Sequence, residues 1–209
     1  MNNKEIQFRE LKKEDFPQVK ELLYQTWIKK DYGDDKRVAD KMSIIFMYEL
    51  LVRHSFSKVA IYEHRVVGII LGRINKDFNL KENLNYLAKM LFTSLSLILT
   101  NNGRKAIKEG SQVNKVNNKL LDKVKDKTDG ELVLFAMNKQ TKGKGIGKKL
   151  LGYFYKYMEK EKANNFYLFT DTSCDYEFYD YNGFTREEEE KIYFKKEVET
   201  YYIYTKNIK

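Results

Sequence analysis

The fold is decided by the stretch Met137-Asn-Lys-Gln-Thr-Lys-Gly-Lys-Gly-Ile-Gly-Lys-Lys-Leu-Leu151, in which a strand-like run passes through three alternating glycines directly into an amphipathic helix. These glycines leave the backbone without Cβ atoms, so the amides of the loop can turn toward a ligand. The helix that follows offers free N–H groups and the positive end of its dipole. Lys148 and Lys149 stand in its first turn, where a cation is unfavourable unless an anion is bound. The stretch predicts a pyrophosphate-binding loop, and the alternative is a glycine-rich turn with incidental lysines.

The segments on either side of this loop alternate between strand-like and helix-like patterns. Strands over Leu132–Met137 and Phe166–Thr170 flank a helix over Gly147–Lys162, which gives a β-loop-α-β unit. Upstream, the periodicity predicts a strand at Ile6–Arg9, a helix that starts at Asp15 and a second helix over Val38–Arg53. It then predicts a hairpin formed by Val59–Tyr62 and Val66–Leu71. Downstream, it predicts a short helix or turn at Ser173–Tyr181 and a chain reversal at Gly183. Two closing strands are predicted at Ile192–Phe194 and Tyr201–Tyr204.

Between Ile74 and Gly130 the pattern changes to that of two inserted helices. The first has one apolar face, formed by Leu84, Leu87, Ala88, Leu91, Leu95 and Ile98. Asn101 to Gly103 are expected to stop it. A second helix is marked by Val113, Val116, Leu120 and Val124. The first helix is so apolar that it is a lid, a dimer contact or ordinary core, because complete exposure is unfavourable.

The composition fits a single domain. With 42% hydrophobic residues, a chain of 209 residues can bury one core, so we expect one domain over 1–209 with the helical insertion at about 74–130. The formal charge of +9 comes from lysines scattered along the chain, usually near Asp or Glu. Such a distribution favours a solvated mixed-charge surface over a patch for nucleic acid, and cofactor phosphates would account for a smaller basic patch.

Membrane and metal chemistry are disfavoured by the same composition. No apolar stretch approaches the roughly 20 residues that span a bilayer, and Met1 to Arg9 lacks an apolar signal core, so a cytoplasmic protein is expected. Cys174 is the only cysteine, which leaves no intramolecular disulfide. With only His54 and His64 in addition, a zinc site of Cys and His ligands cannot be assembled.

The glycine spacing separates this loop from other phosphate loops. A dinucleotide fingerprint needs G-x-G-x-x-G and a Walker loop needs Gly-Lys-Ser/Thr after four residues, and neither occurs here. The segment Lys142-Gly-Lys-Gly145-Ile-Gly147 instead resembles the coenzyme A loop of the GNAT N-acetyltransferase superfamily, Arg/Gln-x-x-Gly-x-Gly/Ala. Lys142 departs from the arginine or glutamine of that pattern, but it keeps the charge.

Further segments resemble the same family in order. Ile6 to Phe16 is similar to its opening strand and first helix, and Val66-Val-Gly-Ile-Ile70 to its third strand. Phe178-Tyr-Asp-Tyr-Asn-Gly-Phe184 resembles its closing Phe/Leu-Tyr-x-x-x-Gly-Phe motif. The resemblance implies an α/β (α+β) GNAT fold, with a mixed twisted sheet of about six to seven strands flanked by helices. The two inserted helices would lie between the third and fourth strands, and the sheet would open between the fourth and fifth.

The resemblance also implies acetyl-CoA as cosubstrate and an amine as acceptor. Backbone groups of Ala136 and Met137 would hold the pantetheine arm and polarise the thioester carbonyl. The pyrophosphate would be bound by loop and helix residues Lys142, Gly143, Lys144, Gly145, Ile146, Gly147 and Lys148. The acetyl group would pass directly to a primary amine in a ternary complex, with no covalent acyl-enzyme and no metal.

Direct attack needs a base and an acid. Glu131 matches the glutamate base of the histone-acetylating branch of the superfamily; the alternative is a solvent-facing residue at a strand start. Asp171 is the second candidate base, with a helix-capping alternative. Tyr179 matches the tyrosine that protonates the leaving thiolate in this family, with Tyr176 as a substitute and plain packing as the alternative. Cys174 is interpreted as a small buried residue rather than a nucleophile.

The acceptor and the partners are less determined. Recognition of the acceptor amine is expected from the loop Asp31–Asp35, the inserted helices Glu82–Thr100 and Gln112–Lys125, and the last hairpin. Protein amines and small molecules both stay open as acceptors, and so does a homodimer. The first alternative function is a catalytically inactive acyl-CoA-binding sensor. The second, more remote one is a basic nucleic-acid-binding protein.

Overall fold

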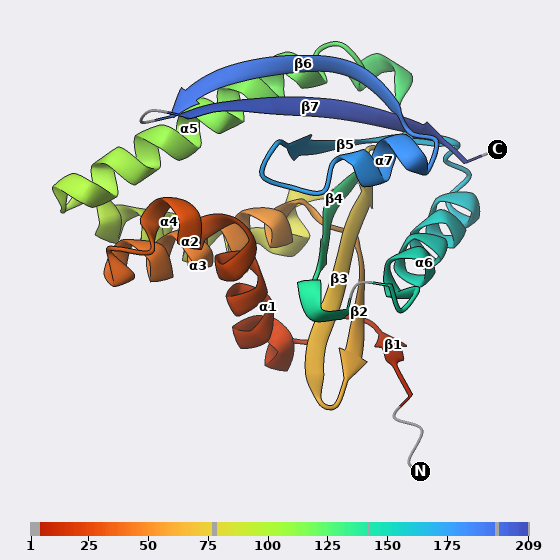
Figure 1. The fold of residues 1–209 in the computed structure, drawn as a ribbon, viewed down its shortest axis with the longest axis horizontal. Coiled ribbons are helices and arrows are strands. Elements are labelled where there is room, and N and C mark those ends of the chain that lie inside the picture. The colour runs from red at the N-terminus through yellow and green to blue at the C-terminus, as the bar shows by residue number, and fades with distance from the viewer. Residues whose placement is uncertain (1–4, 77–78, 142, 195–196, 209) are drawn as a thin grey trace.

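Seven strands form one mixed sheet in the computed structural model, which describes residues 5–76, 79–141, 143–194 and 197–208 (Figure 1). The strand order is β1-β2-β3-β4-β5-β7-β6. The strands are β1 (Gln7–Arg9), β2 (Phe56–Tyr62), β3 (Arg65–Ile74), β4 (Gly130–Met137), β5 (Asn165–Asp171), β6 (Thr185–Phe194) and β7 (Glu197–Asn207). Neighbours are antiparallel except β4 and β5, which are parallel. The expected mixed sheet of six to seven strands is confirmed.

Strands β4 and β5 diverge after a short paired segment, as Figure 1 shows. They pair only where Gly130 meets Phe166 and Glu131 meets Tyr167. Beyond this point β4 continues along β3, and β5 continues along β7. Val133 is an extra residue of β4 with no partner in the β3 register, and such a bulge increases local twist. The expected opening between the fourth and fifth strands is confirmed.

Helices cover both faces of the sheet. One side carries α1 (Phe16–Leu23), α2 (Lys29–Tyr32), α3 (Lys36–Arg53), α4 (Leu84–Ile98) and α5 (Asn101–Leu121), and the other carries α6 (Ile146–Lys160) and α7 (Glu177–Tyr181) (Figure 1). A wider helical turn, Tyr24–Ile28, joins α1 to α2. Short 3₁₀ turns lie at Lys13–Asp15, Leu80–Asn83, Lys125–Lys127 and Lys139–Thr141. The two inserted helices, α4 and α5, lie between β3 and β4, as expected.

The core beneath α6 fixes the helix that follows the glycine loop. Leu150, Phe154 and Met158, spaced by four residues, are fully buried against the sheet. Gly72 of β3 allows this close approach, because a Cβ atom there would lie 2.2 Å from the Phe154 ring. Packing between strand and helix therefore sets where the N-terminus of α6 points.

Two expected element boundaries are wrong. Asn101 to Gly103 do not simply end a helix, because they form the first turn of α5: the Thr100 side chain accepts a hydrogen bond from Gly103 N at 3.1 Å and caps it. The closing strands are also far longer than the apolar runs Ile192–Phe194 and Tyr201–Tyr204. Strand β6 starts at Thr185, which pairs with Thr205 of β7. Because β6 is an edge strand that pairs with β7 alone, it tolerates the charged run before Ile192.

Among the described residues, no helix is both long and apolar enough to cross a membrane.

Candidate functional site

The glycine loop has the backbone that an anion site requires. Gly143 and Gly145 have φ of +85° and +71°, a region that favours glycine, and a Cβ atom at either would meet nothing within 4 Å. Gly147 differs: it lies inside α6, and a Cβ atom there would approach the Phe135 ring at 3.2 Å. Two glycines thus shape the open loop, and the third allows close packing of helix on strand.

The N-terminus of α6 has free amides. Gly145 is the N-cap and supplies no side-chain hydrogen bond. The first intrahelical bond after it runs from Lys149 N to Gly145 O at 3.1 Å, so the N–H groups of Ile146, Gly147 and Lys148 belong to the turn that lacks intrahelical acceptors. These amides and the helix dipole can bind a phosphate group.

The lysines of the loop lie against aromatic rings of the neighbouring strands. Lys144 Nζ lies 4.8 Å from the ring centroid of Tyr62, and Lys149 Nζ lies 5.5 Å from that of Phe8. Lys148 is exposed. Lys142, predicted to bind the pyrophosphate, lies outside the described residues. Lys144, Lys148 and Lys149 therefore place three cations in the loop and at the start of α6.

The end of β4 presents backbone toward the opening. Ala136 and Met137, predicted to hold the pantetheine arm, pair with Ile69 and Gly68 of β3 on one side. On the other side, β5 supplies no ladder partner to the described residues of β4 beyond Glu131. N–H and C=O groups along this edge are free to pair with an extended ligand that carries amides, much as an added strand would.

Tyr179 lies in α7, beside the same opening. Phe178 of α7 contacts Phe135 of β4 with ring centroids 5.7 Å apart, which brings α7 to the diverging strands. The Tyr179 ring packs edge-on against Phe184 at 5.2 Å and is 8% exposed. Burial raises its pKa above the usual 10.0, so its hydroxyl is a proton donor at neutral pH. Both the acid role and the packing role fit this position.

Glu131 lies at the paired end of β4, inside an ionic cluster. It is 1% exposed, so the alternative that it faces solvent is wrong. Its carboxylate lies 2.8 Å from Arg73 Nε and 3.3 Å from Arg53 Nη2, and it accepts a hydrogen bond from Tyr167 Oη at 3.1 Å. Burial raises the pKa of Tyr167 to about 12, which keeps it a donor. This arrangement favours a counter-ion role, and the base role of Glu131 stays a prediction.

Glu131→Gln separates these two roles. If the buried carboxylate mainly neutralises two partly buried arginines, its removal should lower the free energy of unfolding by about 2–3 kcal/mol, because breaking the ion pairs leaves charges uncompensated. The melting temperature should fall by roughly 4–12 °C for a chain of this length. Turnover per folded molecule should change little. Unchanged stability with lost turnover would instead support the base role.

Asp171 lies at the other end of the opening, where β5 ends. Burial raises the pKa of its carboxyl above 3.8, and Glu199 raises it further, while hydrogen bonds from Ser173 N, at 2.7 Å, and from the Ser173 hydroxyl oppose these effects. A carboxylate with a raised pKa at the mouth of the opening fits a general base better than the ion-paired Glu131 does.

Cys174 lies next to Asp171 but is poorly suited to act as a nucleophile. Its sulfur accepts a hydrogen bond from Trp27 Nε1 at 3.1 Å. Burial raises the pKa of its thiol to about 11, so it is a neutral thiol at neutral pH. The contact joins the first helical segment to the end of β5.

Contacts near Asp171 join α2 to the last hairpin and to α5. Lys30 of α2 forms ion pairs with Glu197 at 2.7 Å and Glu199 at 3.2 Å, both in β7. Tyr32 Oη donates to Glu109 of α5 at 2.8 Å. No local sequence pattern predicts these contacts, because the partners lie 169 and 77 residues apart in the chain.

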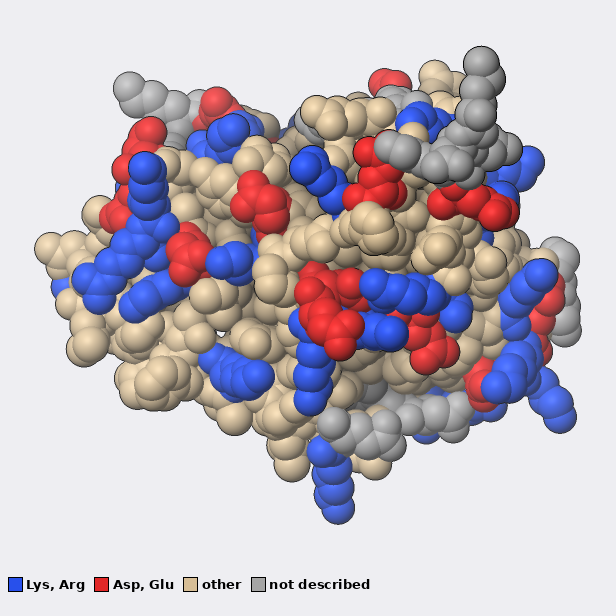
Figure 2. All heavy atoms as spheres, turned by 90° about the horizontal axis from the view of Figure 1, so that it is seen from below, with Lys and Arg blue, Asp and Glu red and all other residues tan. Residues whose placement is uncertain are grey.

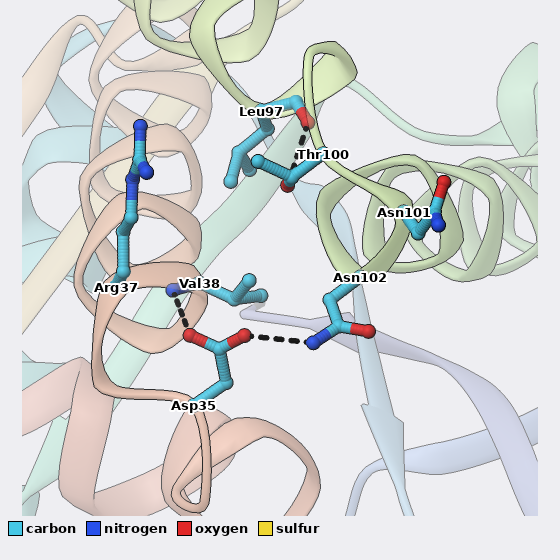
Figure 3. A pocket seen from close by; sticks show the side chains of 7 residues that line it. All are labelled: Asp35, Arg37, Val38, Leu97, Thr100, Asn101 and Asn102. Carbon is cyan, nitrogen blue, oxygen red and sulfur yellow. Dashed lines mark hydrogen bonds between the residues drawn. The ribbon is translucent and has the colours of Figure 1, made fainter.

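Two surface cavities lie elsewhere, among the helices. One, of about 410 Å³, is lined by Asp35, Arg37, Val38, Leu97, Thr100, Asn101 and Asn102 (Figure 3). The carboxylate of Asp35 accepts hydrogen bonds from Val38 N at 3.1 Å and Asn102 Nδ2 at 2.9 Å, so it caps α3 and links it to α5. Because the Asp35 carboxylate is engaged in capping α3, it is poorly suited to act as an acid or base. We therefore place the candidate site at the opening where β4 and β5 diverge.

Charged side chains of both signs are interleaved on the face seen in Figure 2. Within the described part of the chain, no cluster of three or more His, Cys, Asp or Glu side chains could hold a metal ion.

Several solved structures that are similar to this chain are acetyltransferases. Arylalkylamine N-acetyltransferase 2 from Aedes aegypti is 16% identical, with a TM-score of 0.59 over 100% of both chains. The PaiA N-acetyltransferase from Thermoplasma acidophilum, in complex with coenzyme A, is 16% identical, with a TM-score of 0.53 over 97% of this chain and 99% of that one. The ribosomal-protein-S18-alanine N-acetyltransferase from Escherichia coli is 12% identical, with a TM-score of 0.52 over 98% and 94%.

No family model matches the sequence, and the comparison with curated proteins finds no match to it. The structural comparisons nevertheless agree on one architecture. The chain has the fold of the GNAT acetyltransferase superfamily, which confirms the resemblance carried by its glycine loop.

Proposed function

We propose that this protein transfers an acetyl group from acetyl-CoA to a primary amine by direct attack. The observation that carries the proposal is the pairing of two features: β4 and β5 diverge after two residue pairs, and the uncapped N-terminus of α6 stands beside the opening. The open loop at Gly143 and Gly145 supports the fit, because no atom of the described residues, apart from their chain neighbours, lies within 4 Å of a Cβ atom placed at either glycine. Bound acetyl-CoA would supply the activated acetyl thioester.

The residues of the chain divide the work. Loop and helix amides from Lys142 to Lys148 bind the pyrophosphate, and backbone groups of Ala136 and Met137 orient the pantetheine arm. Asp171 accepts the proton that a protonated amine must lose before it attacks. Tyr179 donates a proton to the departing thiolate, which its raised pKa permits at neutral pH.

The first experiment measures the melting temperature with saturating acetyl-CoA, with NAD and ATP as controls. A ligand at 100 times its dissociation constant adds about 2.7 kcal/mol, which should raise the midpoint by roughly 5–10 °C. A rise with acetyl-CoA alone supports the site. The absence of a rise, beside a clear one with NAD or ATP, would refute it.

Tyr179→Phe then tests catalysis apart from binding. Phenylalanine keeps the ring packed on Phe184, so the shift with acetyl-CoA should persist. Release of free coenzyme A thiol with spermidine, phenylethylamine or a lysine peptide should fall about 100-fold, because the leaving thiolate loses its acid. A chain that binds acetyl-CoA but acetylates no amine, with or without this substitution, would be a sensor instead.

A further inference from the structure

Helix α4 carries an apolar stripe on its outward face. Leu84, Ala88, Leu91, Leu95 and Ile98 follow one another at spacings of four, three, four and three residues. All five are exposed, Leu91 and Leu95 at 57% and 61%. Phe92 and Leu99, beside the stripe, are each 78% exposed. This spacing averages 3.5 residues, the period of a coiled-coil seam.

The opposite face of α4 is already occupied. Leu97 is 1% exposed, and Met90 packs with it against α3. Tyr86 packs against the cluster formed by α1, α3 and the sheet. A helix that is apolar all round is normally buried all round. The exposed stripe of α4 therefore needs a cover, and the described residues of this chain do not supply one.

The stripe is large enough for a protein interface. The exposed fractions of its large side chains, with Phe92 and Leu99, correspond to roughly 700–800 Å², close to the about 800 Å² that each partner contributes to a standard interface. Contiguous apolar patches on monomers seldom exceed about 300–600 Å².

Charge favours a second copy of this chain over a membrane. Within Leu84–Ile98, which the structure describes in full, Lys89 is the one charged residue, and its Nζ lies 5.5 Å from the ring centroid of Tyr48. Helices that lie in a membrane interface carry many cations on their polar face. An uncharged stripe of leucines is, by contrast, complementary to itself.

The surface beside the stripe is also suited to a twofold contact. A groove of about 420 Å³ lies between α3 and α4, lined by Ile44, Tyr48, Ala88, Lys89, Phe92 and Thr93. When a ridge lies beside a groove on one copy, a twofold axis can place the ridge of each copy in the groove of the other. We propose that α4 packs antiparallel against α4 of a second copy, with the axis near Leu91, so that the inserted helix makes this protein a homodimer.

Light scattering on the full chain tests the proposal. The expected particle has twice the 25.0 kDa mass of the chain. Leu91→Glu should convert it to a monomer that stays folded, because the side chain is exposed on one copy and two like charges would meet at the axis of the dimer. Tyr181→Glu, a matched change at an 84% exposed residue of α7, should leave the dimer intact. A monomeric wild type, or a dimer that Leu91→Glu leaves intact, overturns the proposal.

Cysteine cross-linking tests the orientation in a Cys174→Ser background. Leu91→Cys should form a disulfide-linked dimer on oxidation, whereas Leu84→Cys should not, because its neighbour across the axis is Ile98. The Leu84→Cys/Ile98→Cys double variant should cross-link, and Tyr181→Cys should not. A dimer linked by Leu84→Cys alone would refute the antiparallel arrangement. If the protein is instead a monomer that binds phosphatidylserine vesicles, and Leu91→Glu abolishes this binding, a membrane covers the stripe and the proposal is overturned.

Discussion

Gly145→Val should abolish the rise in melting temperature that acetyl-CoA produces. Gly145 has φ of +71° and ψ of 5°, a left-handed conformation that a β-branched residue adopts only with strain. The loop should relax to another conformation and turn its amides away from the phosphate. Since a Cβ atom there meets no neighbour within 4 Å, the substitution should cost the fold itself only about 1–2 kcal/mol.

Gly152→Val is the matched control for this experiment. Gly152 lies in the following helix, and a Cβ atom there would also meet nothing within 4 Å, but its backbone has an ordinary helical conformation. This variant should keep the full response to acetyl-CoA, about 2.7 kcal/mol at 100 times the dissociation constant. Equal responses in both variants would show that the conformation of the loop does not determine binding. Calorimetric titration with acetyl-CoA gives the same comparison as a change in affinity.

Asp171→Asn should lower turnover by about 10²–10⁴-fold if Asp171 removes the proton from the amine. In the wild type, kcat/KM should fall as the pH drops through the raised pKa of this carboxyl, because only the ionised form accepts a proton. The variant should lack this acidic limb. Release of coenzyme A thiol, followed across pH with an acceptor from the amine panel, measures both effects.

The stability of the same variant provides the control. Burial raises the pKa of Asp171 in the folded state, so the folded protein binds this proton more tightly than the unfolded chain does. Its contribution to stability therefore falls as the pH rises from 3.8 to the raised value. At neutral pH, asparagine should leave the melting temperature unchanged or higher. A variant that loses turnover and stability together would point to a structural role, and full turnover would return attention to Glu131.

The sequence was sufficient where the signal is local. Three alternating glycines between a strand and a helix predict the loop, and the structure finds positive φ at Gly143 and Gly145. The apolar spacing of Leu150, Phe154 and Met158 predicts the buried face of α6. Backbone conformation at glycine and the 3.6-residue period depend on neighbours in the chain, so both can be read without tertiary information.

The sequence failed where a long-range partner decides. The start of β6 carries the charged run Thr185–Lys191, which shows no strand alternation, and it is a strand because β7 pairs with it. For Glu131, which follows Asp129-Gly130, the sequence left both a base and a solvent-facing residue open. It is buried because Arg53 of α3 and Arg73 of β3 neutralise it.

By itself, then, the sequence determined the glycine loop between strand and helix, the order of the elements and the position of the inserted helices. Tertiary structure alone decided which carboxylate stands at the opening between β4 and β5, and which face of α4 is left uncovered. The physical reason is that burial and charge neutralisation depend on residues far apart in the chain. Lys30 meets Glu199, and Arg53 meets Glu131, only after the sheet and its helices have packed.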